Sequence, residues 1–154
     1  MKRLIVTALV CICYTVFSHA QENTSRPDFY LSAGLSVSNT RDTSFAYSSY
    51  PSLEAGFMKG NFSLGLVVGR SNLSGFKQDV TRNYWYELKG ALYVPVGKFN
   101  AYGLAGIGNY LSTSQFFIEY GIGASYAFNK FGVYAQASNW DGTWYVTPGV
   151  SYTF

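Results

Sequence analysis

The sequence predicts an all-β protein, an eight-stranded antiparallel up-and-down transmembrane β-barrel. Three observations lead to this prediction. Apolar and polar residues alternate in eight separate segments, and a period of two is typical of strands whose two faces meet different environments. The connections between the segments are alternately short and long. Charged residues make up only 12% of the chain, against about 25% in ordinary globular proteins.

The eight segments have lengths close to the roughly 9–11 residues with which a tilted strand crosses a bilayer. They are residues 28–38, 46–58, 61–71, 83–96, 99–110, 115–128, 131–139 and 143–154. After residue 20, the chain has no run of about 18 apolar residues, so membrane-spanning helices are excluded. Apolar residues are instead interleaved with small and polar ones.

The first segments show the alternation clearly. In residues 28–38, Phe29 and Leu35 lie on one face, while Ser32 and Ser36 lie on the other. The fourth segment behaves alike. Its first face carries Tyr84, Tyr86, Leu88, Leu92, Val94 and Val96, and its second face carries Trp85, Glu87, Lys89, Ala91 and Tyr93.

The later segments differ in the strength of their pattern. Residues 99–110 are the weakest, because Gly and Ala occupy both faces. Residues 115–128 are the clearest, with Phe116, Ile118 and Ile122 opposite Glu119 and small residues. The eighth segment ends in strict alternation, with one apolar or aromatic face and one hydroxyl-bearing or small face. Its apolar face comprises Trp144, Val146, Pro148, Val150, Tyr152 and Phe154.

Three connections are predicted as two-residue hairpin turns, because they contain Gly, Asn and Lys between alternating segments. They are Lys59-Gly60, Gly97-Lys98 and Asn129-Lys130. The other connections, residues 39–45, 72–82, 111–114 and 140–142, are longer. Short turns at one end and longer loops at the other are typical of bacterial outer-membrane barrels. This plan places both ends of the barrel on the short-turn, periplasmic side.

Residues 1–20 have the three parts of a cleaved signal peptide: a charged start with Lys2 and Arg3, an apolar run, and small residues before a cut at Gln21. We therefore predict a signal peptide at 1–20, a short periplasmic segment at 21–27 and an outer-membrane barrel at 28–154. Without Lys2 and Arg3, nine basic residues oppose eight acidic ones, a balance that favours no nucleic-acid partner.

Removal of the signal peptide also removes Cys11, Cys13 and His19, which are the only cysteines and the only histidine. The remaining chain then lacks an imidazole to act as general base near neutral pH. It also lacks the nitrogen and sulfur ligands that zinc requires. We expect no enzyme activity, no catalytic residues, no cofactor and no metal.

Periodicity alone does not decide which face points outward, because a soluble lipocalin-like barrel or sandwich would also alternate. The polar face has few charges, namely Glu54, Glu87, Lys89 and Glu119, and is otherwise mainly small or hydroxyl-bearing. This composition favours the crowded lumen of a narrow membrane barrel over a water-exposed surface. We expect these four residues to form a polar network that plugs the lumen; the alternative is a narrow ion or proton path.

The opposite face carries aromatic residues near the strand ends, as in the interfacial girdles of membrane barrels. They are Phe62, Tyr84, Phe99, Phe116, Phe128, Phe131, Trp144 and Phe154. Arg70, Lys77 and Arg82 lie on or beside the 72–82 loop, where cations could contact lipopolysaccharide phosphates. That loop also carries Phe76, so a surface-binding or adhesion function is the main alternative to a structural one.

From residue 28 to Phe154 the chain resembles the small outer-membrane barrels of the OmpX and OmpA-barrel type. The specific match is "TPGVSYTF", in which Thr147, Gly149, Tyr152 and Phe154 occupy the positions of the family's carboxyl-terminal assembly signal. The resemblance implies a porin-like fold in the outer membrane of a Gram-negative-type bacterium. It also implies contact with outer-membrane lipids and the barrel-assembly machinery, and a structural role in the cell envelope. We expect a monomer.

Overall fold

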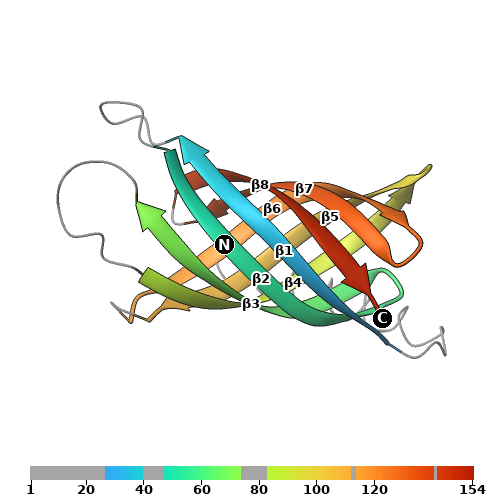
Figure 1. Ribbon diagram of the computed structural model, residues 1–154, viewed down its shortest axis with the longest axis horizontal. Coiled ribbons are helices and arrows are strands. Elements are labelled where there is room, and N and C mark those ends of the chain that lie inside the picture. The colour runs from blue at the N-terminus through green and yellow to red at the C-terminus, as the bar shows by residue number, and fades with distance from the viewer. Residues whose placement is uncertain (1–26, 40–46, 74–82, 112–113, 141) are drawn as a thin grey trace, which may run out of the picture.

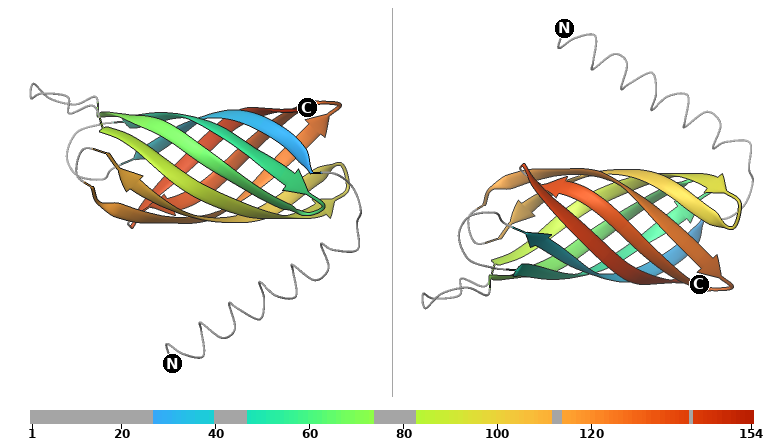
Figure 2. Two further views of the ribbon diagram at one scale, coloured as in Figure 1. Left: turned by 90° about the horizontal axis from the view of Figure 1, so that it is seen from below. Right: turned by 90° about the horizontal axis from the view of Figure 1, so that it is seen from above.

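The computed structural model describes residues 27–39, 47–73, 83–111, 114–140 and 142–154, which form a closed barrel of eight strands (Figures 1 and 2). The strands are β1 (Asp28–Asn39), β2 (Tyr47–Lys59), β3 (Phe62–Leu73), β4 (Asn83–Val96), β5 (Phe99–Tyr110), β6 (Phe116–Phe128), β7 (Phe131–Trp140) and β8 (Thr143–Thr153). The predicted fold class is confirmed. The predicted signal peptide lies outside the described residues.

Each strand pairs in antiparallel fashion with the next one in the sequence, and β8 closes the barrel against β1. The closing register pairs Tyr30 with Thr153 and Leu31 with Tyr152. The backbone N–H of Phe154 extends this pairing by donating to the carbonyl of Phe29 at 2.9 Å. Closure matters because an unpaired strand edge would expose backbone donors and acceptors, which hydrocarbon cannot satisfy.

The short turns lie at one end of the barrel, the end at which β1 begins and β8 finishes (Figure 2). Gly97-Lys98 and Asn129-Lys130 form two-residue turns as predicted. The first turn is corrected by one residue: Lys59 pairs with Phe62, so its loop is Gly60-Asn61 rather than Lys59-Gly60.

The backbone explains that correction. The first loop residue has a positive φ in all three turns: +58° at Gly60, +63° at Gly97 and +60° at Asn129. Gly and Asn adopt this conformation readily, whereas Lys59 at the same position would be strained. The turn therefore begins at the glycine.

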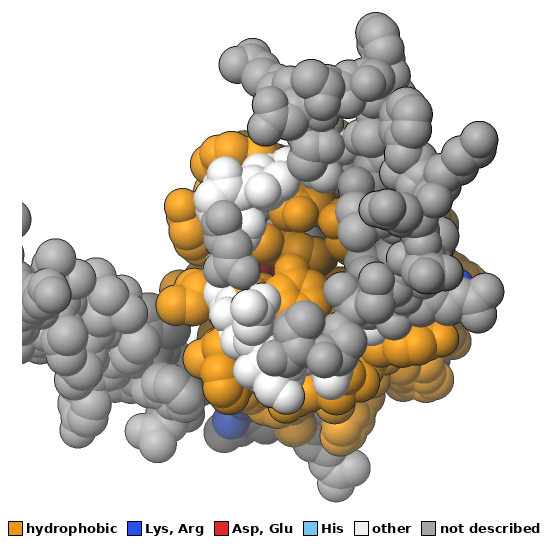
Figure 3. All heavy atoms as spheres, turned by 90° about the vertical axis from the view of Figure 1, so that its left-hand side faces the viewer, with side chains coloured by type: hydrophobic (Ala, Val, Ile, Leu, Met, Phe, Trp, Pro, Cys, Tyr) orange, Lys and Arg blue, Asp and Glu red, His pale blue; other side chains and the backbone are white. Residues whose placement is uncertain are grey.

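Apolar and polar side chains are distributed over the two faces of the barrel in the reverse of the way found in a soluble protein. Large apolar side chains face outward on every strand, and Figure 3 shows hydrophobic side chains covering the visible outer wall. Phe116 and Ile122 are 74% and 69% exposed, whereas Glu87 and Ser138 are fully buried. Within the described residues, no helix is long and apolar enough to cross a membrane.

The packing of β5 explains why the alternation of apolar and polar residues is weak in this strand. Tyr102 and Leu104 face the lumen, and the outward residues around them, Ala101, Gly103 and Ala105, are small. Two of its inward positions, Gly106 and Gly108, are small because neighbouring strands place large side chains over them. A Cβ at Gly106 would overlap the carboxyl group of Glu87. The blurred pattern is thus a consequence of packing inside the barrel.

Candidate functional site in the barrel lumen

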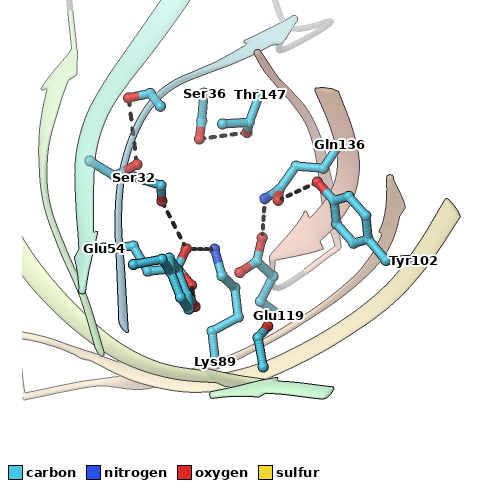
Figure 4. A network of polar contacts seen from close by, with 12 residues as sticks. Ser32, Ser36, Glu54, Lys89, Tyr102, Glu119, Gln136 and Thr147 are labelled. Atoms are coloured by element: carbon cyan, nitrogen blue, oxygen red, sulfur yellow. Dashed lines mark hydrogen bonds and ion pairs between the residues drawn. The ribbon is translucent and has the colours of Figure 1, made fainter. Parts of the chain in front are cut away.

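An ion pair lies in the lumen between β2 and β4. The ammonium group of Lys89 is 2.6 Å from Oε2 of Glu54 (Figure 4). Glu54 also accepts a hydrogen bond from the hydroxyl of Tyr30 and a long one, 3.5 Å, from Ser32. These donors come from β1 and β4, so Glu54 of β2 ties three strands together across the lumen. Gly65 on β3 leaves space for the Glu54 and Tyr30 side chains.

A second polar group links β5, β6 and β7. Gln136 donates to the carboxylate of Glu119 at 3.4 Å, and the Tyr102 hydroxyl donates to the amide oxygen of Gln136 at 3.4 Å. All three side chains are buried. Figure 4 shows Gln136 between Glu119 and Tyr102, on the side of the lumen away from Ser32.

Glu87 is the fourth predicted member of the lumen network, and it is fully buried. Neither oxygen of its carboxyl group has a hydrogen-bond partner among the described residues. Its electrostatic neighbours are Glu119, Lys89 and Glu54. The structure therefore places all four predicted residues in the lumen, but only Glu54 and Lys89 form a direct ion pair.

An aromatic cluster fills the lumen nearer the long connections. Its buried members are Tyr50, Val67, Trp85, Phe117, Trp140 and Tyr145, with Tyr110 packed against them. The ring centroids of Trp85 and Trp140 are 5.0 Å apart, and those of Trp140 and Tyr145 are 4.6 Å apart. Such edge-to-face and tilted arrangements are favourable for aromatic pairs. The cluster brings together side chains from β2, β3, β4, β6, β7 and β8 at that level of the lumen.

The half nearer the short turns contains a cavity of about 230 Å³. Its walls carry phenol rings, hydroxyl groups and side-chain amides, and they include the Glu54–Lys89 pair. Turn residues Gly60, Asn61 and Asn129 are at its border, so it lies toward the short-turn end. The side chains of the aromatic cluster do not line it.

The predicted assembly-signal residues each have a place in the barrel. Thr147 is buried and donates to the hydroxyl of Ser36 at 2.7 Å, across the β1–β8 closure. A Cβ at Gly149 would overlap the ring of Tyr134. Tyr152 and Phe154 have ring centroids 5.1 Å apart, and Phe154 is 61% exposed on the outer wall.

Of the three predicted surface cations, the structure describes Arg70. Its guanidinium group lies 5.9 Å from the ring centre of Tyr84, its partner across β3 and β4. This position is near the long-connection end, on the outer wall. Lys77 and Arg82 lie outside the described residues, as does Phe76.

Sequence reasoning missed the aromatic cluster. Trp85, Phe117 and Tyr145 do fall on the face that the alternation predicts to be inward, so their parity was the available signal. It also missed the individual partners Tyr30, Ser36 and Gln136, since pairing across a lumen depends on the barrel's register. Among the described residues, no group of three His, Cys, Asp or Glu side chains is arranged to hold a metal ion.

Together, the closed sheet and the apolar outer wall define the class of protein: a narrow eight-stranded antiparallel β-barrel with its large apolar side chains on the outside. The chain is similar to the crystal structure of the N-terminal β-barrel domain of Pseudomonas aeruginosa OprF. The similarity has a TM-score of 0.59 and 17% sequence identity, and covers 84% of this chain and 100% of that one. At this identity the likeness supports the fold alone.

A second similarity, to the KdgM porin in complex with disordered oligogalacturonate, covers 84% of this chain and 99% of that one. Its TM-score is 0.28 and its sequence identity is 15%, which is too low to support a conclusion about this chain. No protein-family model matches the sequence. A comparison with curated protein sequences gives no match either.

Proposed function

We propose that this protein is an integral outer-membrane β-barrel with a structural, envelope-maintaining role and a lumen filled by side chains. The proposed location is the outer membrane of a Gram-negative-type bacterium, with the short-turn end facing the periplasm. Its proposed surroundings are outer-membrane lipids and lipopolysaccharide. The family type we infer is that of the OmpX and OmpA barrels, and the proposed role is not catalytic.

The observation that carries this proposal is the inversion of the usual burial pattern. In water, exposing rings and aliphatic chains on all eight strands would be unfavourable by about 25 cal/mol for each Å² of apolar surface. Inside a bilayer the same apolar surface contacts apolar lipid chains. The closed hydrogen-bonded sheet also leaves no strand edge in hydrocarbon. The aromatic residues near the strand ends suit the two interfaces.

The packing of side chains in part of the lumen favours a structural role over a pore. Eight strands enclose an interior just wide enough for side chains. Here the aromatic cluster fills one level, while Glu87 and Glu119 are 0% and 1% exposed at another. Side chains therefore pack in the lumen at both of these levels.

The proposal predicts a heat-modifiable membrane protein. Because all strands pair with two neighbours, the folded barrel should resist detergent at room temperature and migrate differently on gels before and after boiling. The measurement is gel mobility of the outer-membrane fraction, with circular dichroism to verify β-structure. Equal mobility in both samples, or recovery of the protein in the periplasmic fraction, would count against the proposal.

The carboxyl-terminal strand provides a sharper test. Phe154→Asp should block insertion, because it puts a charge on the outer wall beside Tyr152 and removes the terminal aromatic ring of the proposed assembly signal. Membrane-inserted and periplasmic protein should be compared after expression in a bacterium with an outer membrane. Phe154→Tyr, which keeps the ring, is the matched control. Normal insertion of Phe154→Asp would contradict the proposal that the terminal residues are an assembly signal.

A further inference from the structure

The cavity in the short-turn half of the lumen has no part in the proposed structural role. Its volume of about 230 Å³ far exceeds the roughly 10–15 Å³ that a single water needs. It is smaller than the approximately 300–1,000 Å³ of sites for drug-sized ligands. The size suits one small molecule, comparable to a monosaccharide.

Two hydrogen bonds between uncharged groups of its walls are long, whereas the Glu54 carboxylate is closely paired with Lys89 and Tyr30. The hydroxyl of Ser63 lies 3.5 Å from that of Tyr93, and Tyr102 lies 3.4 Å from Gln136. O–H···O hydrogen bonds in proteins are usually about 2.5–3.0 Å long. By contrast, the Thr147–Ser36 bond outside the cavity is 2.7 Å. The hydroxyls and the amide of the cavity thus retain capacity to donate to and accept from a ligand.

The charge of the walls is already balanced. Glu54 accepts from Lys89, Tyr30 and Ser32, and the ammonium group of Lys89 lies 2.6 Å from that carboxylate. A charged ligand would have to displace one member of this pair. An uncharged ligand would not, because its hydroxyl groups could bond to the free hydrogen positions of Lys89 and to the wall hydroxyls.

The rings of the cavity supply flat apolar surfaces beside these polar groups. Tyr93 and Tyr102 have ring centroids 5.0 Å apart, and both rings line the cavity. Ring faces next to mixed donors and acceptors match a molecule with C–H surfaces and many hydroxyl groups. Residues of the short turns, Gly60, Asn61 and Asn129, border the cavity and the aromatic cluster does not, so we take its entrance to be at the short-turn end.

From these observations we propose that the short-turn half of the lumen is a binding pocket for one small, uncharged, polyhydroxylated molecule of the monosaccharide type. Tyr102, Gln136 and Lys89 provide its hydrogen-bonding groups, and Tyr93 provides a ring surface. The pocket goes beyond the envelope role, since binding depends on the folded lumen and not on the membrane in which the barrel resides.

The test uses isotope-labelled protein refolded in detergent micelles and titrated with glucose, while backbone amide shifts are recorded by NMR. We expect saturable shifts at pocket residues on β4, β5 and β7, and none in the aromatic cluster. Glucosamine and glucuronate, which have the same ring with a positive or a negative charge, should bind more weakly. No saturable shift with glucose, or tighter binding of a charged analogue, would overturn the proposal.

Three variants locate the site. Ser125→Leu, which adds volume to the cavity wall, should abolish the shifts. Tyr102→Phe keeps the ring but loses one hydroxyl, and should weaken binding about 2- to 10-fold. Ser36→Ala, outside the cavity, should leave affinity unchanged. If Ser125→Leu fails to fold, as judged by gel mobility, Tyr102→Phe decides: unchanged affinity there would overturn the proposed pocket.

Discussion

The two halves of the lumen are stabilised by different interactions. Near the long connections, Trp85, Phe117 and Trp140 pack ring against ring with exposures of 1–3%. Near the short turns, hydroxyls, amides and the Glu54–Lys89 pair surround a cavity. One half therefore depends on contact between apolar surfaces, and the other on hydrogen bonds and charge.

The difference shows two ways in which side chains can occupy the lumen of a narrow barrel. In the packed half, the indole N–H groups of Trp85 and Trp140 have no hydrogen-bond partner among the described residues, so their contribution there comes from ring contacts. The polar half leaves a cavity between its side chains, and the hydrogen bonds among its uncharged groups are long, at 3.4–3.5 Å. We expect mutations in the packed half to cost more than equivalent ones in the polar half.

The largest effect on stability should come from Trp140→Ala. Trp140 contacts the rings of Trp85, Phe117, Tyr145 and Tyr50, and removing such a side chain typically costs about 3–5 kcal/mol. Urea unfolding of barrels refolded into lipid bilayers would measure the loss. Trp140→Phe is the control, because it keeps a ring and removes an N–H that lacks a partner. A loss below about 1 kcal/mol for Trp140→Ala would contradict tight packing in this half.

Lys89→Ala should have the next largest effect. Removing one member of a buried pair leaves the other charge uncompensated, which costs about 3–5 kcal/mol for full burial. Because the Glu54 and Lys89 side chains are 10% and 11% exposed, we expect the lower end of that range. Lys89→Met combined with Glu54→Gln should recover most of the loss. If Lys89→Ala leaves urea unfolding unchanged, the lumen network does not hold the barrel together.

Two glycine-to-alanine substitutions should have the smallest effects on stability, and they compare the two halves directly. At Gly108 a Cβ would overlap the Phe117 ring and lie 2.6 Å from the carbonyl oxygen of Tyr86, so Gly108→Ala should cost about 1–3 kcal/mol through overpacking. At Gly149 the three atoms nearest to a Cβ all belong to the side chain of Tyr134, which borders the cavity and is not backbone. Gly149→Ala should therefore cost less.

Gly103→Ala serves as the reference for both glycine variants, because nothing lies within 4 Å of a Cβ there. Its free energy of unfolding should change little. All three would be measured by urea unfolding of refolded protein, so that any effect of Gly149 on assembly in cells does not enter. An equal loss for Gly108→Ala and Gly149→Ala would contradict the contrast between a packed and a loose half.

Much of the fold could be predicted because local rules sufficed. The number and approximate bounds of the strands follow from alternation, and two of three short turns were placed correctly. The first turn was misplaced by one residue because composition alone did not tell which residue takes the positive φ at Gly60. The inward position of Glu54, Glu87, Lys89 and Glu119 also follows from parity.

What the sequence by itself determined is the face on which each residue lies, because side chains along a strand alternate strictly. Only the tertiary structure decided which inward residues meet. Thr147 bonds to Ser36, 111 positions away, and Trp140 of β7 packs edge-to-face with Trp85 of β4. Such partners are set by the stagger between strands and by the closure of β8 on β1, which fix the height of each residue in the lumen. The odd or even position of a residue in its strand gives its face and not its height along the barrel axis. The division into a packed half and a half with a cavity therefore became visible only in the closed barrel.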